Sequence, residues 1–157
     1  MAGVDCNKLS FRPVDPATAE KISGALASME PWLTLGIHAA SLSDMLLAAD
    51  AHLHRHAICL NGTCVGVVAV RNPWLYGPYV ALLGVLPQWQ GMGIGSAVLS
   101  RIEQETKPRP KNLWVCVSSF NEEAKRFYER NAFEPAGSLP GLLCEEFTEI
   151  LMRKRII

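Results

Sequence analysis

The sequence has no excess of either charge, because fifteen Lys and Arg balance fifteen Asp and Glu among its 157 residues. A protein that binds nucleic acid through bulk positive charge is therefore not expected, and no nucleic-acid partner is predicted. No apolar run approaches the length of about 18 residues that a membrane-spanning helix needs, so no membrane partner is predicted either. The first residues, Met1 to Lys8, lack the apolar core of a signal peptide, which favours a cytoplasmic location.

Cysteines are few, and their positions follow no zinc-binding spacing: Cys6, Cys59, Cys64, Cys116 and Cys144. We expect reduced thiols. Cys59 and Cys64 flank an Asn-Gly pair that is typical of a two-residue hairpin, so a disulfide across the hairpin stays an open alternative. His52, His54 and His56 alternate along the sequence, so on a strand they would share one face, a spacing compatible with metal binding. An exposed strand start accounts for them equally well, and no metal is predicted.

The length and the 49% hydrophobic content suit a single domain over residues 1–157. Strands are expected at 8–14, 56–60, 64–71, 79–86 and 112–117, with two more after Phe133. Helices are expected after Asp15-Pro16, after a Ser41 cap, after a glycine loop at 90–95 and after a Ser119 cap, with an apolar loop at 31–40. This order predicts a mixed α/β (α+β) fold with a mostly antiparallel sheet flanked by helices. Strands 79–86 and 112–117 are joined through a helix and should be parallel.

The glycine loop, Gln90-Gly91-Met92-Gly93-Ile94-Gly95, lies between a buried strand and a helix N-terminus. Unpaired N–H groups and the positive end of the helix dipole make such a place an anion site, although glycines needed only for tight packing are the alternative. A nucleotide-triphosphate loop is disfavoured because Ser96 follows Gly95 with no lysine between them. A dinucleotide fingerprint is disfavoured because the glycine spacing differs and the next strand ends in Ser118-Ser119 rather than in an acid.

Two segments resemble motifs of the GNAT superfamily of N-acetyltransferases. Residues 85–95 resemble motif A, whose pattern Gln/Arg-x-x-Gly-x-Gly/Ala is met by Gln90, Gly93 and Gly95. Residues 121–133 resemble motif B, in the expected order after one intervening strand. The resemblance covers essentially the whole chain. It implies the GNAT fold with a splayed parallel strand pair, and transfer of the acetyl group of acetyl-CoA to a primary amine through a tetrahedral intermediate.

The resemblance also implies which residues bind acetyl-CoA. Its pyrophosphate would lie on main-chain N–H groups of the loop that follows Gln90: Gly91, Met92, Gly93, Ile94, Gly95 and Ser96. Its pantetheine arm would pair with the main chain of Leu83, Gly84 and Val85 and would accept or donate a hydrogen bond at Asn121. Tyr128 would protonate the leaving thiolate as a general acid. The alternative for Tyr128 is a core aromatic on an apolar helical stripe.

The general base and the acceptor are less defined. Ribosomal-protein acetyltransferases of the superfamily carry a glutamate where this chain has Cys116, and a buried thiol is a poor substitute. Ordered water, Glu145, Glu146, His38 and Asp50 stay open as bases. Acceptor residues are expected in 31–40, 72–78 and 138–146, with Trp32, Trp74 and Tyr76 as apolar walls and Glu145 and Glu146 attracting a cationic amine.

A small-molecule amine is the preferred acceptor. A protein or peptide N-acetyltransferase and a non-catalytic acyl-CoA-binding regulatory module are the alternatives. The resemblance is compatible with a homodimer.

Overall fold

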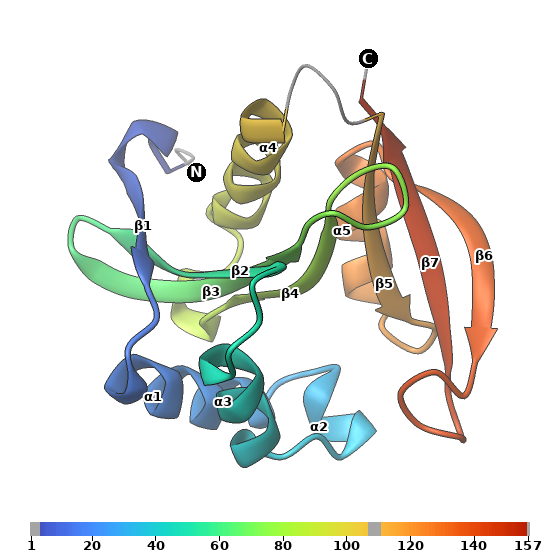
Figure 1. Cartoon of the computed structure of the whole chain (residues 1–157), viewed down its shortest axis with the longest axis horizontal. Helices are drawn as coiled ribbons and strands as arrows, with labels where there is room; N and C mark the ends of the chain where they lie inside the picture. Colours follow the sequence, from blue (N-terminus) through green and yellow to red (C-terminus); the bar gives the residue numbers. More distant parts are fainter. Residues whose placement is uncertain (1–3, 107–110, 157) are drawn as a thin grey trace.

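The computed structural model describes residues 4–106 and 111–156, and it has the mixed α/β fold that the sequence predicts (Figure 1). One seven-stranded sheet has the order β1-β2-β3-β4-β5-β7-β6. Its strands are β1 (Leu9–Pro13), β2 (Leu53–Leu60), β3 (Thr63–Arg71), β4 (Tyr79–Val85), β5 (Asn112–Ser118), β6 (Glu134–Pro140) and β7 (Thr148–Arg155). The helices are α1 (Pro16–Ala27), α2 (Trp32–Leu35), α3 (Ala39–Leu47), α4 (Ile94–Thr106) and α5 (Glu122–Arg130), with 3-10 turns at Cys6–Lys8 and Pro87–Trp89.

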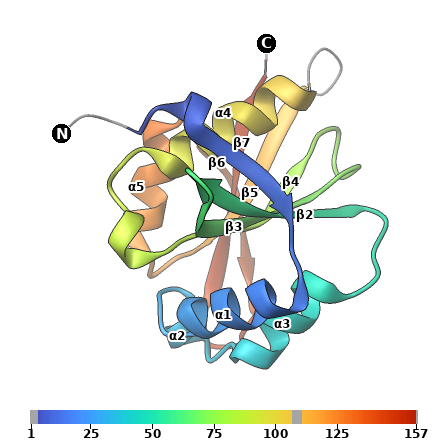
Figure 2. The same cartoon turned by 90° about the vertical axis from the view of Figure 1, so that its left-hand side faces the viewer.

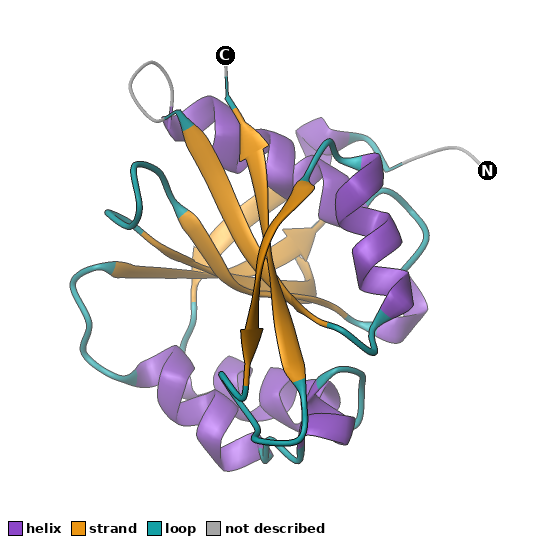
Figure 3. Cartoon of the chain, turned by 90° about the vertical axis from the view of Figure 1, so that its right-hand side faces the viewer, coloured by secondary structure: helices purple, strands orange, loops and turns teal. Residues whose placement is uncertain are grey.

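Helices cover both faces of the sheet. The helices α1, α2 and α3 lie on one side, and α4 and α5 lie on the other (Figures 1 and 2). Seen from the opposite edge, the strands separate the two groups of helices (Figure 3). Ile22 and Leu26 of α1 pack on the first face, and Val98 and Ile102 of α4 pack on the second. The central strands are buried on both faces, which is why β4 and β5 are almost continuously apolar in sequence.

Several local signals are confirmed. The carboxylate of Asp15 caps α1 by accepting a hydrogen bond of 2.7 Å from the N–H of Thr18. Asn61 and Gly62 both have positive φ, 51° and 83°, as the turn between β2 and β3 requires. Cys59 and Cys64 lie opposite each other across that hairpin, as predicted, and both are free thiols.

Two helix starts were wrongly predicted, and one short helix was missed. The segment 31–40 is not a loop throughout, because it contains the one-turn helix α2, which ends at Gly36 with a left-handed φ of 68°. Helix α3 then begins at Ala39, with His38 in the cap position, rather than after Ser41. Asn121, not Ser119, caps α5, and its side chain accepts from the N–H of Ala124. Local cap signals compete, and tertiary packing selects among them.

The strand β2 begins at Leu53, three residues earlier than predicted, so His54 and His56 lie within it. The ring of His56 stacks on Phe11 with 5.7 Å between centroids. Within residues 4–106 and 111–156, no three His, Cys, Asp or Glu side chains gather as a metal site. In the same part of the chain, no helix is long and apolar enough to cross a bilayer.

The parallel strands β4 and β5 part after two residue pairs. They are paired at Tyr79 with Trp114 and at Val80 with Val115, and at no later position that the structure describes. On the other side of β4, the pairing with β3 skips Ala81, since Val80 and Leu82 pair with consecutive β3 residues. Such a bulge bends its strand and increases the local twist. The bulge at Ala81 therefore accompanies the divergence that opens the sheet between β4 and β5.

The helix α1 supports the diverging strand through Leu26. This side chain is fully buried, and an added Cβ at Gly84 of β4 would lie 2.5 Å from its Cδ2 atom. We expect Leu26→Ala to lower the free energy of unfolding by about 2–5 kcal/mol, because it leaves a cavity against β4. The control is Leu33→Ala, whose side chain is 59% exposed and whose loss should cost under about 0.5 kcal/mol. Urea unfolding measures both, and equal losses would contradict the packing described.

Candidate active site

A cleft of about 770 Å³ opens where β4 and β5 diverge. One wall is formed by β4 and the glycine loop, and the other by β5 and the start of α5. The segment 29–37 closes one end, and Leu143 of the β6–β7 connection also lines it. The space is therefore made by the separation of two strands that an ordinary sheet would hold together.

The glycines of the loop have two different roles. Gly91 and Gly93 have positive φ of 74° and 83°, and an added Cβ at either would meet nothing within 4 Å. Their backbone faces open space in front of the first turn of α4, where N–H groups have no helical partner. At Gly95 an added Cβ would lie 2.8 Å from the Phe127 ring, so this glycine allows α5 to pack on α4. Tight packing thus explains Gly95, whereas Gly91 and Gly93 leave room for an anion.

Side chains around the loop fix its position. The amide nitrogen of Gln90 donates a 2.9 Å hydrogen bond to the carbonyl of Val85, which ties the loop to the end of β4. The carbonyl of Met92 accepts from the N–H of Val4 at 2.9 Å. Met92 is absent from the cleft wall. The other residues expected to hold acetyl-CoA all line the cleft: Leu83, Gly84, Val85, Gln90, Gly91, Gly93, Ile94, Gly95, Ser96 and Asn121.

The edge of β4 that faces the cleft has main-chain groups with no β5 partner after Val80. Unpaired main-chain groups in a half-buried strand need hydrogen-bond partners from solvent or from a ligand. An extended ligand with amide groups fits this edge. At Asn121 the side-chain oxygen already caps α5, so a hydrogen bond from this residue to a ligand has to come from its amide nitrogen.

Tyr128 of α5 lies in the cleft wall and is 7% exposed. Its ring contacts Phe127 and Phe133 edge to face, with centroids 4.9 Å and 5.3 Å apart. Burial raises the pKa of the Tyr128 phenol above its usual range, so the hydroxyl keeps its proton at neutral pH. The side chain is both a core aromatic and a proton-bearing group at the cleft, which reconciles the two interpretations of the sequence.

A cluster of polar side chains lines the cleft along β5. The sequence analysis did not predict that these side chains lie together. Ser118 of β5 pairs in register with Glu149 of β7, and its hydroxyl donates a 2.6 Å hydrogen bond to the Glu149 carboxylate. Two residues earlier on the same face of β5 is Cys116, and it and Tyr79 each influence the pKa of the other. The Glu149 residue is 2% exposed and still lines the cleft.

Burial dominates the electrostatics of this cluster. It raises the pKa of the Glu149 carboxyl, and the hydrogen bond from Ser118 works in the opposite direction but is the smaller effect. Burial also raises the pKa of the Cys116 thiol and of the Tyr79 phenol, so both stay neutral at neutral pH. Negative charge on Cys116, and to a smaller extent on Glu149 or Tyr128, also raises the pKa of Tyr79. Glu149 is thus the group of the cluster that can carry charge near neutral pH.

Of the residues expected to contact the acceptor, the structure brings Trp32 to the cleft. The ring of Trp74 packs on that of Tyr79, with 4.8 Å between their centroids. Tyr76 is 82% exposed. Glu145 and Glu146 are exposed in the β6–β7 connection. Trp74, Tyr76, Glu145 and Glu146 do not line the cleft, and their contact with an acceptor stays a prediction.

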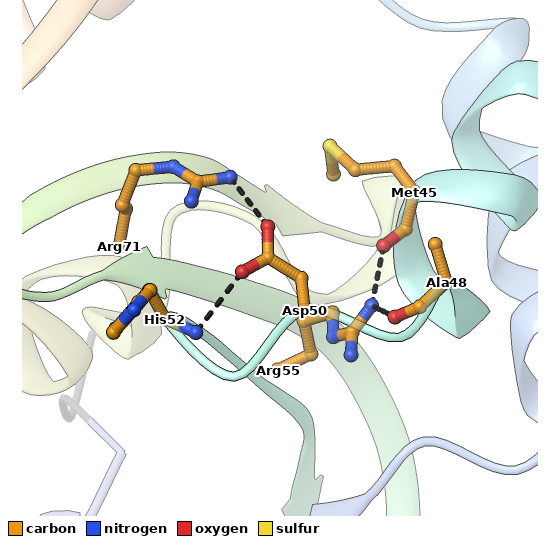
Figure 4. Close-up of polar contacts among 6 residues, drawn as sticks. All are labelled: Met45, Ala48, Asp50, His52, Arg55 and Arg71. Atoms are coloured by element: carbon orange, nitrogen blue, oxygen red, sulfur yellow. Dashed lines mark hydrogen bonds and ion pairs between the residues drawn. The ribbon is translucent and has the colours of Figure 1, made fainter.

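The open candidates for the base lie elsewhere as well. Asp50 forms an ion pair of 2.9 Å with Arg71 and accepts from the N–H of His52, while Arg55 beside it binds carbonyls at the end of α3 (Figure 4). The hydrogen bond from Arg71 lowers the pKa of Asp50. Neither Asp50 nor His38 lines the cleft. Glu149 is the carboxylate that the structure brings to the polar cluster.

Comparisons with known proteins agree with this geometry. Residues 23–133 match the sequence model of the acetyltransferase (GNAT) family. No curated protein matches the chain significantly.

Solved structures share the fold at low identity. An acetyltransferase from Thermus thermophilus is 19% identical, with TM-score 0.75, covering 94% of this chain and 97% of that one. An aminoglycoside 6'-N-acetyltransferase complexed with coenzyme A is 16% identical, with TM-score 0.74, covering 95% and 97%. A ribosomal-protein-alanine N-acetyltransferase from Escherichia coli is 18% identical, with TM-score 0.69, covering 94% of each chain.

The open glycine Gly93 allows a matched test of the loop. Gly93 and Gly62 have the same φ of 83° and nothing within 4 Å of an added Cβ, but Gly62 lies in the distant β2–β3 turn. We expect Gly93→Ala and Gly62→Ala to lose similar stability, about 1–2 kcal/mol each from left-handed strain. Only Gly93→Ala should weaken coenzyme A binding in calorimetry, by about tenfold or more, equivalent to about 1.4 kcal/mol. Equal affinities in the two variants would mean that the loop does not cradle the cofactor.

Proposed function

The chain belongs to the GNAT family of acetyltransferases, and we propose that it transfers the acetyl group of acetyl-CoA to the primary amine of a small molecule. The observation that carries the proposal is the parting of β4 from β5 beside a glycine loop that faces open space. The glycine loop, the unpaired edge of β4 and the buried phenol of Tyr128 all line the same cleft. A loop, a strand edge and a proton donor suit the pyrophosphate, the amide groups and the thioester of one long cofactor.

In the proposed arrangement, the loop from Gly91 to Ser96 holds the pyrophosphate through main-chain N–H groups and the dipole of α4. The main chain of Leu83, Gly84 and Val85 pairs with the pantetheine arm. The donor-side residues in the cleft wall support this assignment, and the Gln90 bond to Val85 keeps the two binding segments in fixed relation.

The proposed reaction is direct attack of a neutral amine on the thioester carbonyl carbon. A carbon–nitrogen bond forms, and a main-chain N–H near Val85 stabilises the negative oxygen of the tetrahedral intermediate. The carbon–sulfur bond then breaks, and Tyr128 donates its hydroxyl proton to the leaving sulfur. The surplus proton on the new amide nitrogen restores the phenol. The raised pKa of Tyr128 keeps that proton in place until the thiolate forms.

A small amine is the proposed acceptor because aromatic side chains are expected around the acceptor end of the cleft, and because the chain has no excess of positive charge. Trp32 offers an apolar wall, and the Glu149 carboxylate attracts a cationic group. The shared fold does not choose between acceptors, since its relatives include both an aminoglycoside and a ribosomal-protein acetyltransferase. Four free thiols support a reducing, cytoplasmic setting. A panel of propylamine, spermidine, kanamycin and an alanine-initiated peptide separates the acceptor classes by rate of thiol release.

Cofactor choice is tested by thermal unfolding with acetyl-CoA, NADH or ATP. We expect acetyl-CoA alone to raise the melting temperature, because a ligand at about 100 times its Kd stabilises the native state by about 2.7 kcal/mol. A rise with NADH or ATP of the same size would point to general nucleotide binding. No rise with acetyl-CoA would overturn the proposed function.

Turnover is tested by Tyr128→Phe. We expect kcat for the fastest amine of the panel to fall by about 10²–10⁴, the usual contribution of a positioned acid, while the acetyl-CoA melting shift is kept. Tyr76→Phe is the matched control, since it removes a phenol hydroxyl from a residue that is 82% exposed, and its rate should equal that of the wild type. A protein that binds acetyl-CoA but releases no thiol with any amine would be the non-catalytic module instead.

A further inference from the structure

We propose that Glu149 is the general base of this active site and that it also selects a cationic amine as acceptor. The inference rests on the proposed acetyl transfer and adds the residue that prepares the nucleophile. The proposal begins from the position of the side chain. Strand β7 lies inside the sheet, between β5 and β6, and Glu149 is a carboxylate on this interior strand. The residue is 2% exposed and is one of those that line the cleft.

The carboxylate has one hydrogen-bond donor and no cation. Ser118 donates to Oε1 at 2.6 Å, and within residues 4–106 and 111–156 no other hydrogen bond and no ion pair to Glu149 occurs. A buried carboxylate without a cationic partner is costly to fold, so it is either protonated or waiting for a charged ligand. The other carboxylate oxygen, Oε2, accepts no hydrogen bond from the described residues and is not completely buried. We place the ammonium of the acceptor against this oxygen.

The groups that face Glu149 are neutral on every side that packs against it. From β5 they are Ser118 and Cys116, from β4 Tyr79, and from β6 the register partner Leu139. None of these supplies a positive charge. The charged residues Glu30, Glu123 and Arg130 also line the cleft, and within the described residues none of them forms an ion pair or hydrogen bond with Glu149. Burial therefore sets the behaviour of the carboxyl and raises its pKa. A base with a pKa closer to the working pH accepts a proton more effectively than an ordinary surface glutamate. The position of Glu149 beside the cleft and its surroundings thus fit the same role.

The proton transfer completes the balance of the reaction. The acceptor enters as R–NH₃⁺, which the Glu149 carboxylate attracts and binds. One N–H bond breaks, its proton goes to Oε2, and the nitrogen keeps the electron pair that attacks the thioester carbon. Glu149 later releases this proton to solvent, while Tyr128 and the amide nitrogen exchange the second proton as the thiol leaves. The base and the acid therefore come from different elements, β7 and α5, that line one cleft.

The first test compares Glu149→Gln with Glu134→Gln, an exposed carboxylate on the neighbouring strand β6. In thiol release with spermidine, kanamycin and propylamine, we expect Glu149→Gln to lower kcat/KM by about 10²–10⁴ at neutral pH and Glu134→Gln to leave it unchanged. The wild-type rate should fall as the pH drops through the pKa of Glu149, because the protonated carboxyl accepts nothing. The rate of Glu149→Gln should lack this step and should depend on pH only through the deprotonation of the amine.

Ser118→Ala provides a variant that keeps the carboxylate. Its hydroxyl stabilises the charged form of Glu149, so its removal should move the acidic step of the rate profile to higher pH. A merely structural contact would lower stability without moving that step. If Ser118→Ala leaves the step in place while Glu149→Gln retains the wild-type profile, Glu149 is not the base.

Infrared titration tests the same inference without an acceptor. In difference spectra between wild type and Glu149→Gln, the band of a protonated carboxylic acid should persist to a pH above the ordinary range of glutamate. Ionisation of Glu149 within the ordinary range would overturn the proposal. A melting shift with acetyl-CoA in both proteins separates the outcomes: if that shift is missing, the proposed function fails, and if it is present while the profile is unchanged, only the role of Glu149 fails.

Discussion

The separation of β4 from β5 is the constraint on which the rest of the site depends. Two parallel strands that are paired at Tyr79 and Val80 and then diverge leave an edge of unpaired main chain inside the sheet. The bulge at Ala81 bends β4 away, and Leu26 of α1 packs against Gly84 to hold the strand there. The glycine loop, the Tyr128 phenol on α5 and the Glu149 carboxylate on β7 all line the cleft that this divergence opens.

The cleft has a donor side and an acceptor side that differ in chemistry. In the proposed arrangement, the donor side uses main chain almost entirely, with glycines for the phosphates and a strand edge for the amides of acetyl-CoA. The acceptor side uses side chains from β4, β5 and β7 whose charge is controlled by burial. A main-chain site tolerates change in most side chains, whereas a buried carboxylate depends on its neighbours. The two sides can therefore be altered independently.

The donor side could be predicted from sequence because its signals are local. The glycine spacing and the apolar run of β4 each lie in consecutive residues, as does the Asn61-Gly62 turn that predicted the hairpin elsewhere in the sheet. The position of Glu149 could not be predicted, because it depends on β7 lying between β5 and β6, which follows from pairing between distant segments. In a strand taken by itself, Glu149 resembles a solvent-facing residue. One sequence signal pointed to it: Glu149 is an acidic residue directly before the apolar residues Ile150, Leu151 and Met152. An acidic residue in an interior strand is rare unless it is paired or functional.

The interior place of β7 has a consequence for how the protein is made. The glycine loop, α4 and β5 all precede the hairpin of β6 and β7 along the chain. During synthesis, the glycine-loop side of the cleft therefore leaves the ribosome before the strand that carries Glu149. Until that strand inserts beside β5, Ser118 has no carboxylate to bind, and the sheet ends at an open edge. Insertion of β7 thus gives β5 its second neighbour and brings the Glu149 carboxylate to Ser118 in the same step.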